Sequence, residues 1–387
     1  MAENLAREIA VVQPNSPLVD RIINERTAGF RDGVPLTSAQ YFQSNRALVA
    51  EVLNQCFWAS LAHEEGRPVA SGVTFVGPDE MGLSEPLSLE RPELLTQKNL
   101  VHLATVAGTT HRLAVHQLDG KAYIWGLLRG EGPPYWLTIW FDRPARLRVM
   151  VEGGFILGVL DRGKILTPHG NAMANRWNVR TQLQNLLGTL RPDLIEALMY
   201  VANEMSRHGH GGALLVVSGD LLWKEQLRFT YSLDERSRTL LRRLRQRPQP
   251  ISNPGSAATH EELDARAELA RAAEQVASLT KIDGAAVVGI DLEVFGFGAR
   301  ITSDDLAATK PILRRRTIYE QDFAEVPWTD LGGTRHQSAA RFVAATKTSA
   351  AFVASHDGGL STLAWKAEPP PGHLEWLCGL EDLVAPR

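Results

Sequence analysis

The spacing of hydrophobic and polar positions changes along the first half of the chain. Over residues 44–61, apolar side chains recur every three or four positions, which predicts an amphipathic helix. Over residues 72–166 the chain instead contains short β-branched and aromatic runs, separated by turn dipeptides such as Asp-Gly and Gly-Gly. This second pattern predicts an antiparallel sheet domain over residues 45–168. The runs are VHLATVA, HRLAVHQL, AYIWGLL, YWLTIWF, RLRVMVE and FILGVL.

The second half alternates between strand and helix patterns. GGALLVVSGD (211–220) is an unbroken apolar run, as expected of a strand that is buried on both faces, and AAVVGI (285–290) predicts a second buried strand. VFGFGARI, SAAFVAS and LSTLAW predict further strands. Helices are predicted over residues 180–207, 233–247, 261–279 and 338–346, and a Pro-rich loop over residues 248–260.

These patterns predict a two-domain α/β (α+β) protein. The first domain, residues 1–180, is rich in strands. The second, residues 181–387, is a mixed sheet flanked by helices that ends in a short C-terminal tail. A length of 387 residues accommodates both.

Composition narrows the class of protein. A net charge of -3 argues against a nucleic-acid partner, because such proteins usually carry a strong positive balance. Cys56 and Cys378 lie too far apart for a metal motif or a disulfide framework, which favours a reducing compartment. We find no apolar run long enough for a membrane span and no secretory signal, so we expect a cytoplasmic protein with no membrane partner.

Two short polar segments carry candidate chemistry. In the first, KIDGA (281–285), Asp283 offers a hard oxygen to a divalent cation, and Gly284 leaves room for a ligand against the backbone. The second, GGTRHQSA (332–339), leads into a helix and offers backbone amides, a guanidinium and an imidazole for phosphate groups. Residue chemistry alone leaves a structural role open, since Asp-Gly is common in turns and Thr334 or Ser338 would serve as a helix N-cap.

The order of these pieces resembles the diadenylate cyclase family over about residues 190–368. The family signatures are Asp-Gly-Ala, here residues 283–285, and Arg-His-Arg, here Arg335-His336-Gln337. SLAHEEGRPV (60–69) and the β-rich run after it are similar to the sensor domain that precedes some of these cyclases. That second resemblance implies a sensor ligand of unknown identity.

The cyclase resemblance implies that two ATP molecules are condensed into cyclic di-AMP, with release of pyrophosphate. Two domains would face each other in a homodimer or a larger oligomer. Asp283 would hold Mg²⁺ or Mn²⁺ and help activate a 3′-hydroxyl, and Arg335 and His336 would complete the catalytic set. The implied nucleotide-binding residues are Gly284, Ala285, Gly333, Thr334, Gln337, Ser338 and Ser355.

Two departures from the family pattern affect this interpretation. Gln337 replaces the last arginine of the second signature and lacks its charge and its fork of donors. Ser355-His356-Asp357 stands where the family usually has Ser-Glu-Glu; Asp357 keeps an acidic group and is the second candidate metal ligand. Two hypotheses therefore stand side by side: an active cyclase, and a cyclase-like module that binds nucleotide but turns over slowly or not at all.

We expect structural roles for most other notable residues. His208 and His210 lack an evident third metal ligand and are expected to be loop histidines. Trp125, Trp136 and Trp140 are expected to pack in the sheet. The arginine clusters at residues 314–316 and 242–247 are the only support for a nucleic-acid-binding hypothesis, and we expect the first cluster to lie in a solvated loop.

Overall fold

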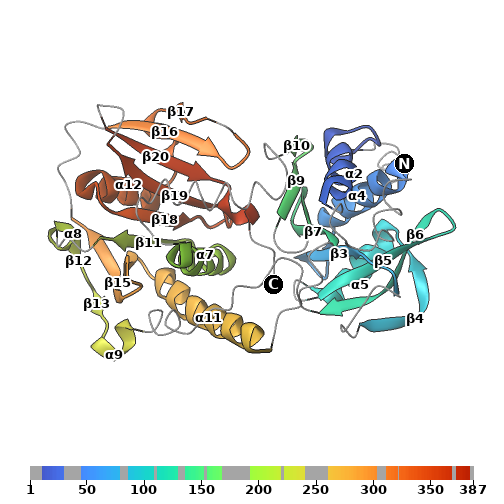
Figure 1. Ribbon diagram of the computed structural model, residues 1–387, viewed down its shortest axis with the longest axis horizontal. Coiled ribbons are helices and arrows are strands. Elements are labelled where there is room, and N and C mark those ends of the chain that lie inside the picture. The colour runs from blue at the N-terminus through green and yellow to red at the C-terminus, as the bar shows by residue number, and fades with distance from the viewer. Residues whose placement is uncertain are drawn as a thin grey trace. The chain divides into compact units, whose positions relative to one another are not determined.

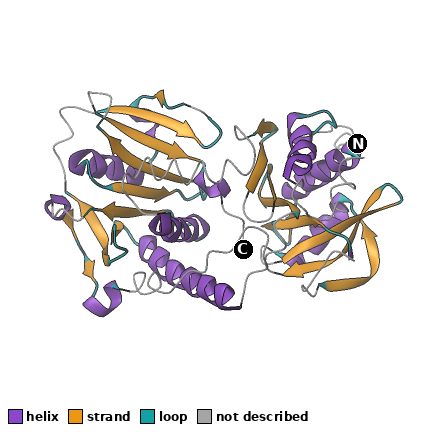
Figure 2. Cartoon of the chain, in the orientation of Figure 1, coloured by secondary structure: helices purple, strands orange, loops and turns teal. Residues whose placement is uncertain are grey.

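The computed structural model of the chain forms two compact units, Met1–Arg176 with Ala385–Arg387, and Trp177–Val384. Both combine strands with helices, which confirms the predicted mixed α/β class (Figure 2). The structure describes residues 11–29, 45–78, 86–108, 111–129, 136–151, 155–167, 192–218, 222–239, 260–302, 311–320, 322–367 and 372–383. Predictions at 180–191, including the domain boundary, and at 240–259 lie outside these residues.

An eight-stranded sheet forms the first unit, in the order β10-β9-β8-β7-β3-β5-β6-β4 (Figure 1). All its pairs are antiparallel except β3 with β5, so the prediction of a purely antiparallel sheet is wrong at that pair. The chain leaves β3, forms β4 and a helix, and returns in the same direction, as parallel pairs require. The strands are β3 (Ser71–Phe75), β4 (Leu87–Leu94), β5 (His111–Leu118), β6 (Lys121–Arg129), β7 (Leu137–Arg143), β8 (Arg146–Val151), β9 (Phe155–Asp161) and β10 (Lys164–Leu166).

Three helices pack with this sheet: α2 (Pro17–Gly29), α4 (Arg46–Ser60) and α5 (Gln97–Ala107). The predicted helix at 44–61 is confirmed as α4, where the Asn45 side chain accepts a hydrogen bond from the Leu48 amide at 3.0 Å. The predicted strand VHLATVA is wrong, because those residues lie within α5. No apolar period in the sequence predicted α2.

A small hairpin follows α4. Its strands β1 (His63–Glu64) and β2 (Arg67–Pro68) are joined by Glu65 and Gly66, whose φ angles are 51° and 78°. Two successive positive φ values are those of a tight two-residue hairpin turn. Trp125, Trp136 and Trp140 are all at most 5% exposed, which confirms their packing in the sheet.

The second unit is built on a ten-stranded sheet in the order β12-β15-β14-β11-β18-β19-β20-β16-β17, with β13 paired to β15 (Figure 1). β11 with β14 and β16 with β20 are parallel pairs. Its strands are β11 (Gly212–Val217), β12 (Leu227–Arg228), β13 (Tyr231–Ser232), β14 (Ala285–Gly289), β15 (Val294–Ile301), β16 (Ile312–Thr317), β17 (Ala324–Glu325), β18 (Ala350–Ala354), β19 (Leu360–Lys366) and β20 (His373–Cys378).

Helices cover the central strands of this sheet. Every residue of β11, β14 and β18 is buried, which confirms the two covered faces predicted for β11 and the burial predicted for β14. α12 (Thr334–Thr346) packs on β11, β18 and β19, and α7 (Pro192–Arg207), itself packed against α11 (His260–Ser278), also contacts β18 and β19. The shorter helices are α8 (Leu222–Glu225), α9 (Glu235–Arg238), η2 (Leu279–Lys281), η4 (Trp328–Leu331) and η5 (Leu380–Leu383).

Two predictions about the second unit are wrong. The arginines at 314–316 lie on β16 rather than in a loop, and the predicted C-terminal tail contributes β20, which lies between β19 and β16. The Arg315 and Arg316 guanidinium groups lie over the rings of Trp376 and Phe323, at 5.2 and 4.5 Å from the ring centroids. The run of arginines did not indicate a strand in the sequence. It is compatible with one because the aliphatic part of an arginine side chain packs on apolar surface.

Candidate functional site

Three segments meet at one edge of the ten-stranded sheet. β11 and β14 are parallel neighbours that both begin at this edge, at Gly212 and Ala285. β18 runs in the opposite direction and ends there, because Ala354 pairs with Gly212. The edge therefore brings together the loop before β11, the Asp-Gly turn before β14 and the turn after β18.

The Asp-Gly turn presents an exposed carboxylate. Asp283 lies between η2 and β14, and its Oδ1 accepts a hydrogen bond from the Gly284 amide at 3.1 Å. Gly284 has a φ of +103°, and a Cβ at this position would lie 2.7 Å from the Gly298 carbonyl carbon. This glycine is thus required by the close approach of β15, whether or not a ligand is bound.

The second signature forms the first turn of a helix. α12 begins at Thr334, four residues before the predicted start, with Gly333 as its N-cap and no side-chain cap. The predicted caps Thr334 and Ser338 are therefore wrong: both lie inside the helix. A first turn without a side-chain cap leaves amide donors open to an anion.

Arg335 crosses to the loop before β11. Its Nη1 lies 3.4 Å from His356 Nε2. A Cβ on Gly211 would lie 2.9 Å from the same Nη1 of Arg335. Its Nε is buried and has no hydrogen-bond partner among the described residues. The guanidinium thus occupies a narrow space between backbone and imidazole.

His336 points toward the sheet. Its Nε2 lies 3.0 Å from the Ser361 hydroxyl on β19, and its ring meets that of Trp376 edge-on at 5.8 Å. Burial lowers the pKa of His336, with Asp357 opposing that shift. The imidazole is therefore held in its neutral form, and its predicted catalytic role stays a prediction.

Asp357 stabilises the turn after β18 through side-chain hydrogen bonds. Its Oδ1 accepts hydrogen bonds from the Ser355 hydroxyl and from the Gly359 amide. The Ser355 amide also donates to the Gly359 carbonyl oxygen at 2.9 Å. Across the part of the chain that the structure describes, no three His, Cys, Asp or Glu residues gather into a metal cluster. The metal roles of Asp283 and Asp357 stay predictions.

Sequence reasoning missed a histidine network beside this turn. The His210 amide donates to His208 Nδ1 at 3.2 Å, and His208 Nε2 lies 3.1 Å from the buried Thr280 hydroxyl. Burial, followed by the positive charges of Lys281, His210 and Arg335, lowers the pKa of His208 to about 4. The neutral ring thereby links the loop before β11 to η2, just ahead of Asp283.

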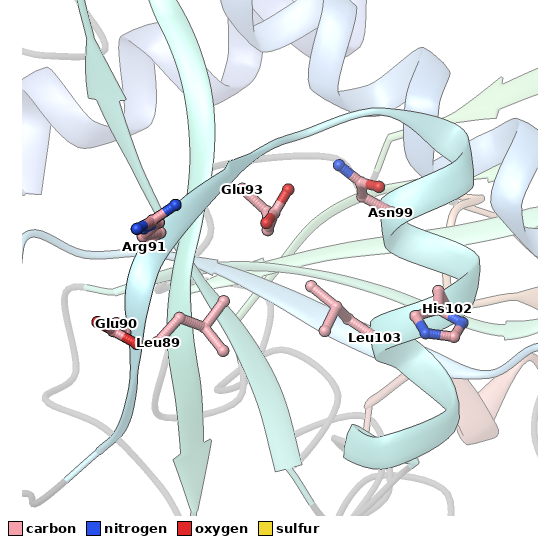
Figure 3. A pocket seen from close by; sticks show the side chains of 7 residues that line it. All are labelled: Leu89, Glu90, Arg91, Glu93, Asn99, His102 and Leu103. Carbon is pink, nitrogen blue, oxygen red and sulfur yellow. The ribbon is translucent and has the colours of Figure 1, made fainter.

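The first unit contains a separate hollow between β4 and α5 (Figure 3). β4 pairs with β6 at Ser88 and again at Glu93, so the residues between them arch away from the sheet. Leu89 and Leu103 point toward each other across the hollow, which has a volume of about 590 Å³. Its lining residues are Leu89, Glu90, Arg91, Glu93, Asn99, His102 and Leu103.

Residues 39–129 match a known family model. The family is described as "Probable sensor domain DACNV". This DACNV segment runs through α4, the β1–β2 hairpin and α5, and includes the hollow. The resemblance of SLAHEEGRPV to a sensor domain is therefore confirmed. No family model of a diadenylate cyclase catalytic domain matches the chain, and no curated protein matches it.

The hairpin of the DACNV segment lies beside the hollow. His102 Nδ1, from the lining of the hollow, lies 3.9 Å from Glu64 Oε1 of β1. The Asn99 side chain donates to the Leu94 carbonyl oxygen at 2.9 Å, joining the end of β4 to α5. The hollow is thus bordered by three elements of the DACNV segment.

Among the described residues, no helix combines the length and apolar character that crossing a membrane requires.

Proposed function

We propose that the chain is a diadenylate cyclase regulated by its DACNV segment. One observation carries the proposal: the Asp-Gly-Ala turn and the Arg335 helix start, far apart in sequence, flank the same sheet edge. The Ser355–Asp357 turn lies at the same edge and meets the Arg335 helix start through the contact between His356 and Arg335. An exposed carboxylate beside a cationic, uncapped helix start suits a metal-bound triphosphate.

The protein groups at the sheet edge would each have a role in this reaction. A 3′-hydroxyl oxygen of one ATP attacks the α-phosphorus of the other, the hydroxyl proton leaves, and pyrophosphate departs; two such steps close the cyclic dinucleotide. Arg335 and the first-turn amides of α12 would bind the triphosphate and stabilise its charge. Mg²⁺ or Mn²⁺ would supply Lewis-acid stabilisation there, and the exposed Asp283 suits it because nucleotide-bound Mg²⁺ takes only one or two carboxylates.

Two copies of the chain are needed in this proposal. Each copy would bind one ATP and present it to the other, so the reacting atoms meet only in a face-to-face pair. Proximity of the bound nucleotides would then supply a large part of the rate.

We place this activity in the cytoplasm, where ATP is abundant and the free thiols of Cys56 and Cys378 stay reduced.

The DACNV segment would set the activity through a ligand in the hollow. Apolar Leu89 and Leu103 would contact the body of that ligand, and Glu93, Asn99 and His102 would orient its polar groups. We propose no nucleic-acid partner, since Arg315 and Arg316 pack on aromatic rings of the sheet.

A nucleotide-binding sensor without turnover is the second candidate. The Gln337 side chain donates to the Gly332 carbonyl oxygen at 3.2 Å, so it stays with its own helix start. This amide supplies no charge to a triphosphate, unlike the arginine of the family signature.

Pyrophosphate release separates the candidates. The purified full chain is mixed with ATP and Mn²⁺, and pyrophosphate is followed by a coupled assay alongside equilibrium binding of ATP. The cyclase proposal predicts pyrophosphate release by the wild type and its loss in Arg335→Ala. Saturable ATP binding without pyrophosphate would support the sensor candidate and overturn the cyclase.

A further inference from the structure

We propose that His356 is a positioning residue that fixes the Arg335 guanidinium, with its imidazole donating a hydrogen bond from Nδ1 and accepting one at Nε2. The proposal rests on the proposed function, in which Arg335 binds the triphosphate. Neither family signature contains His356, which lies in the turn after β18.

The partners of the ring determine its tautomer. His356 Nδ1 lies 3.2 Å from the Gly209 carbonyl oxygen, which can only accept a hydrogen bond. His356 Nε2 lies 3.4 Å from Arg335 Nη1, which can only donate. Both contacts are satisfied only if Nδ1 carries the proton and Nε2 keeps its lone pair. A ring protonated at Nε2 would oppose an N–H to the guanidinium.

The backbone at Gly211 lies close to the guanidinium. Gly211 has a φ of +67°, and a Cβ there would meet Arg335 Nη1 at 2.9 Å. Arg335 Nε is buried without a partner among the described residues, so His356 provides the hydrogen-bond acceptor at this end of the side chain. Segments around positions 209, 335 and 356 thus form one slot for the cation.

The use of an imidazole as the hydrogen-bond acceptor has a functional consequence. A free arginine side chain loses rotamer entropy when it binds phosphate, and fixing it beforehand removes part of that cost. A carboxylate would also orient the guanidinium but would cancel its charge. The imidazole of His356 orients Arg335 and leaves its full positive charge for an anionic ligand.

Two amide substitutions divide the functions of the ring. In His356→Gln the side-chain carbonyl reaches the place of Nε2 and can still accept from Arg335. In His356→Asn the shorter amide can bond only to the Gly209 carbonyl oxygen. Both variants are polar and smaller than histidine, so a role in packing alone would affect them alike, and a role limited to the Gly209 contact would affect His356→Gln more.

The experiment measures ATP affinity and turnover with Mn²⁺ for the wild type and both variants of the full chain. It also records the tautomer of His356 by ¹⁵N NMR of the imidazole nitrogens. We expect His356→Asn to raise the KM and the ATP dissociation constant about 10-fold with a smaller change in kcat, and His356→Gln to stay within about threefold of the wild type. We also expect the Nδ1–H tautomer.

Each contrary result has a distinct meaning. Equal losses in the two variants, or an Nε2–H tautomer, would overturn the positioning role. Should the wild type bind ATP without turnover, the cyclase proposal fails while the affinity comparison still tests His356. Should it bind no ATP, the proposed function fails and the tautomer alone decides whether His356 can hold Arg335.

Discussion

Individual residues at the sheet edge are of two kinds. Asp283 and Arg335 belong to short motifs and could be found from the sequence. The contacts of His208, Thr280 and His356 could not be predicted, because they join segments up to 147 positions apart and leave no local pattern. The sequence did point to a special role for Gly284, but the structure assigns it to close packing against Gly298.

Gly284→Ala should destabilise the second unit. The new methyl group would lie 2.7 Å from the Gly298 carbonyl carbon, at a φ that side chains rarely adopt. We expect a loss of about 2 kcal/mol in the free energy of unfolding, measured by urea denaturation. Gly333→Ala is the matched control, since its φ is -71° and nothing lies within 4 Å; it should cost less than about 1 kcal/mol. Equal losses would contradict this packing argument.

His208 should make the fold sensitive to acid. Its pKa is about 4 in the folded chain and returns to the ordinary histidine value of 6.5 on unfolding, so the unfolded chain takes up a proton first as the pH falls. Stability should therefore decline from about pH 6.5 to about pH 4 and change no further through this group below that. Because the ring is half-exposed, we expect on the order of 1 kcal/mol. Urea denaturation of His208→Gln should show a shallower decline; an unchanged slope would exclude His208 as its source.

At the scale of elements, the apolar periods located α4, α11 and the buried strands β11, β14 and β18. They failed at α5, where β-branched residues in VHLATVA favour a strand. The Thr96 hydroxyl accepts from the Asn99 amide at 3.2 Å, and Leu100, Ala104 and Ala107 are buried at helical spacing. A helix cap and tertiary packing thus outweigh the local preference.

Thr96→Ala tests this helix directly. Loss of the cap should lower the free energy of unfolding by about 1 kcal/mol, measured by urea denaturation. Thr105→Ala, at an exposed position of the same helix, should change it by less than about 0.5 kcal/mol. If residues 97–107 formed a strand, removing the Thr96 hydroxyl would have no such effect.

In the whole molecule, the two units contain different functional features. The DACNV match lies within the first unit, and the second unit brings the two segments that resemble cyclase signatures, residues 283–285 and 335–337, to one edge of its sheet. The α/β class of both was predictable from alternating patterns. The parallel pair β3–β5 and the strand β20 were not, because strand order depends on long-range packing rather than on local sequence.

Activity should depend on pairing of chains. If each copy supplies one ATP, specific activity will rise with protein concentration until the pair is saturated, since monomers cannot complete the product. Rate measurements across a dilution series, with sedimentation velocity at the same concentrations, check this. Constant specific activity in a sample that sediments as a monomer would contradict the two-copy reaction.

We propose that Asp283 and Arg335 belong to one site that makes a cyclic dinucleotide. Mass spectrometry of the product formed from ATP by the full chain tests it most directly, with Mn²⁺ present and with Asp283→Asn as the matched variant. We expect cyclic di-AMP from the wild type and a yield lower by roughly 100-fold or more from the variant. Undiminished cyclic di-AMP from Asp283→Asn, or none from a folded wild type that binds ATP, would contradict it.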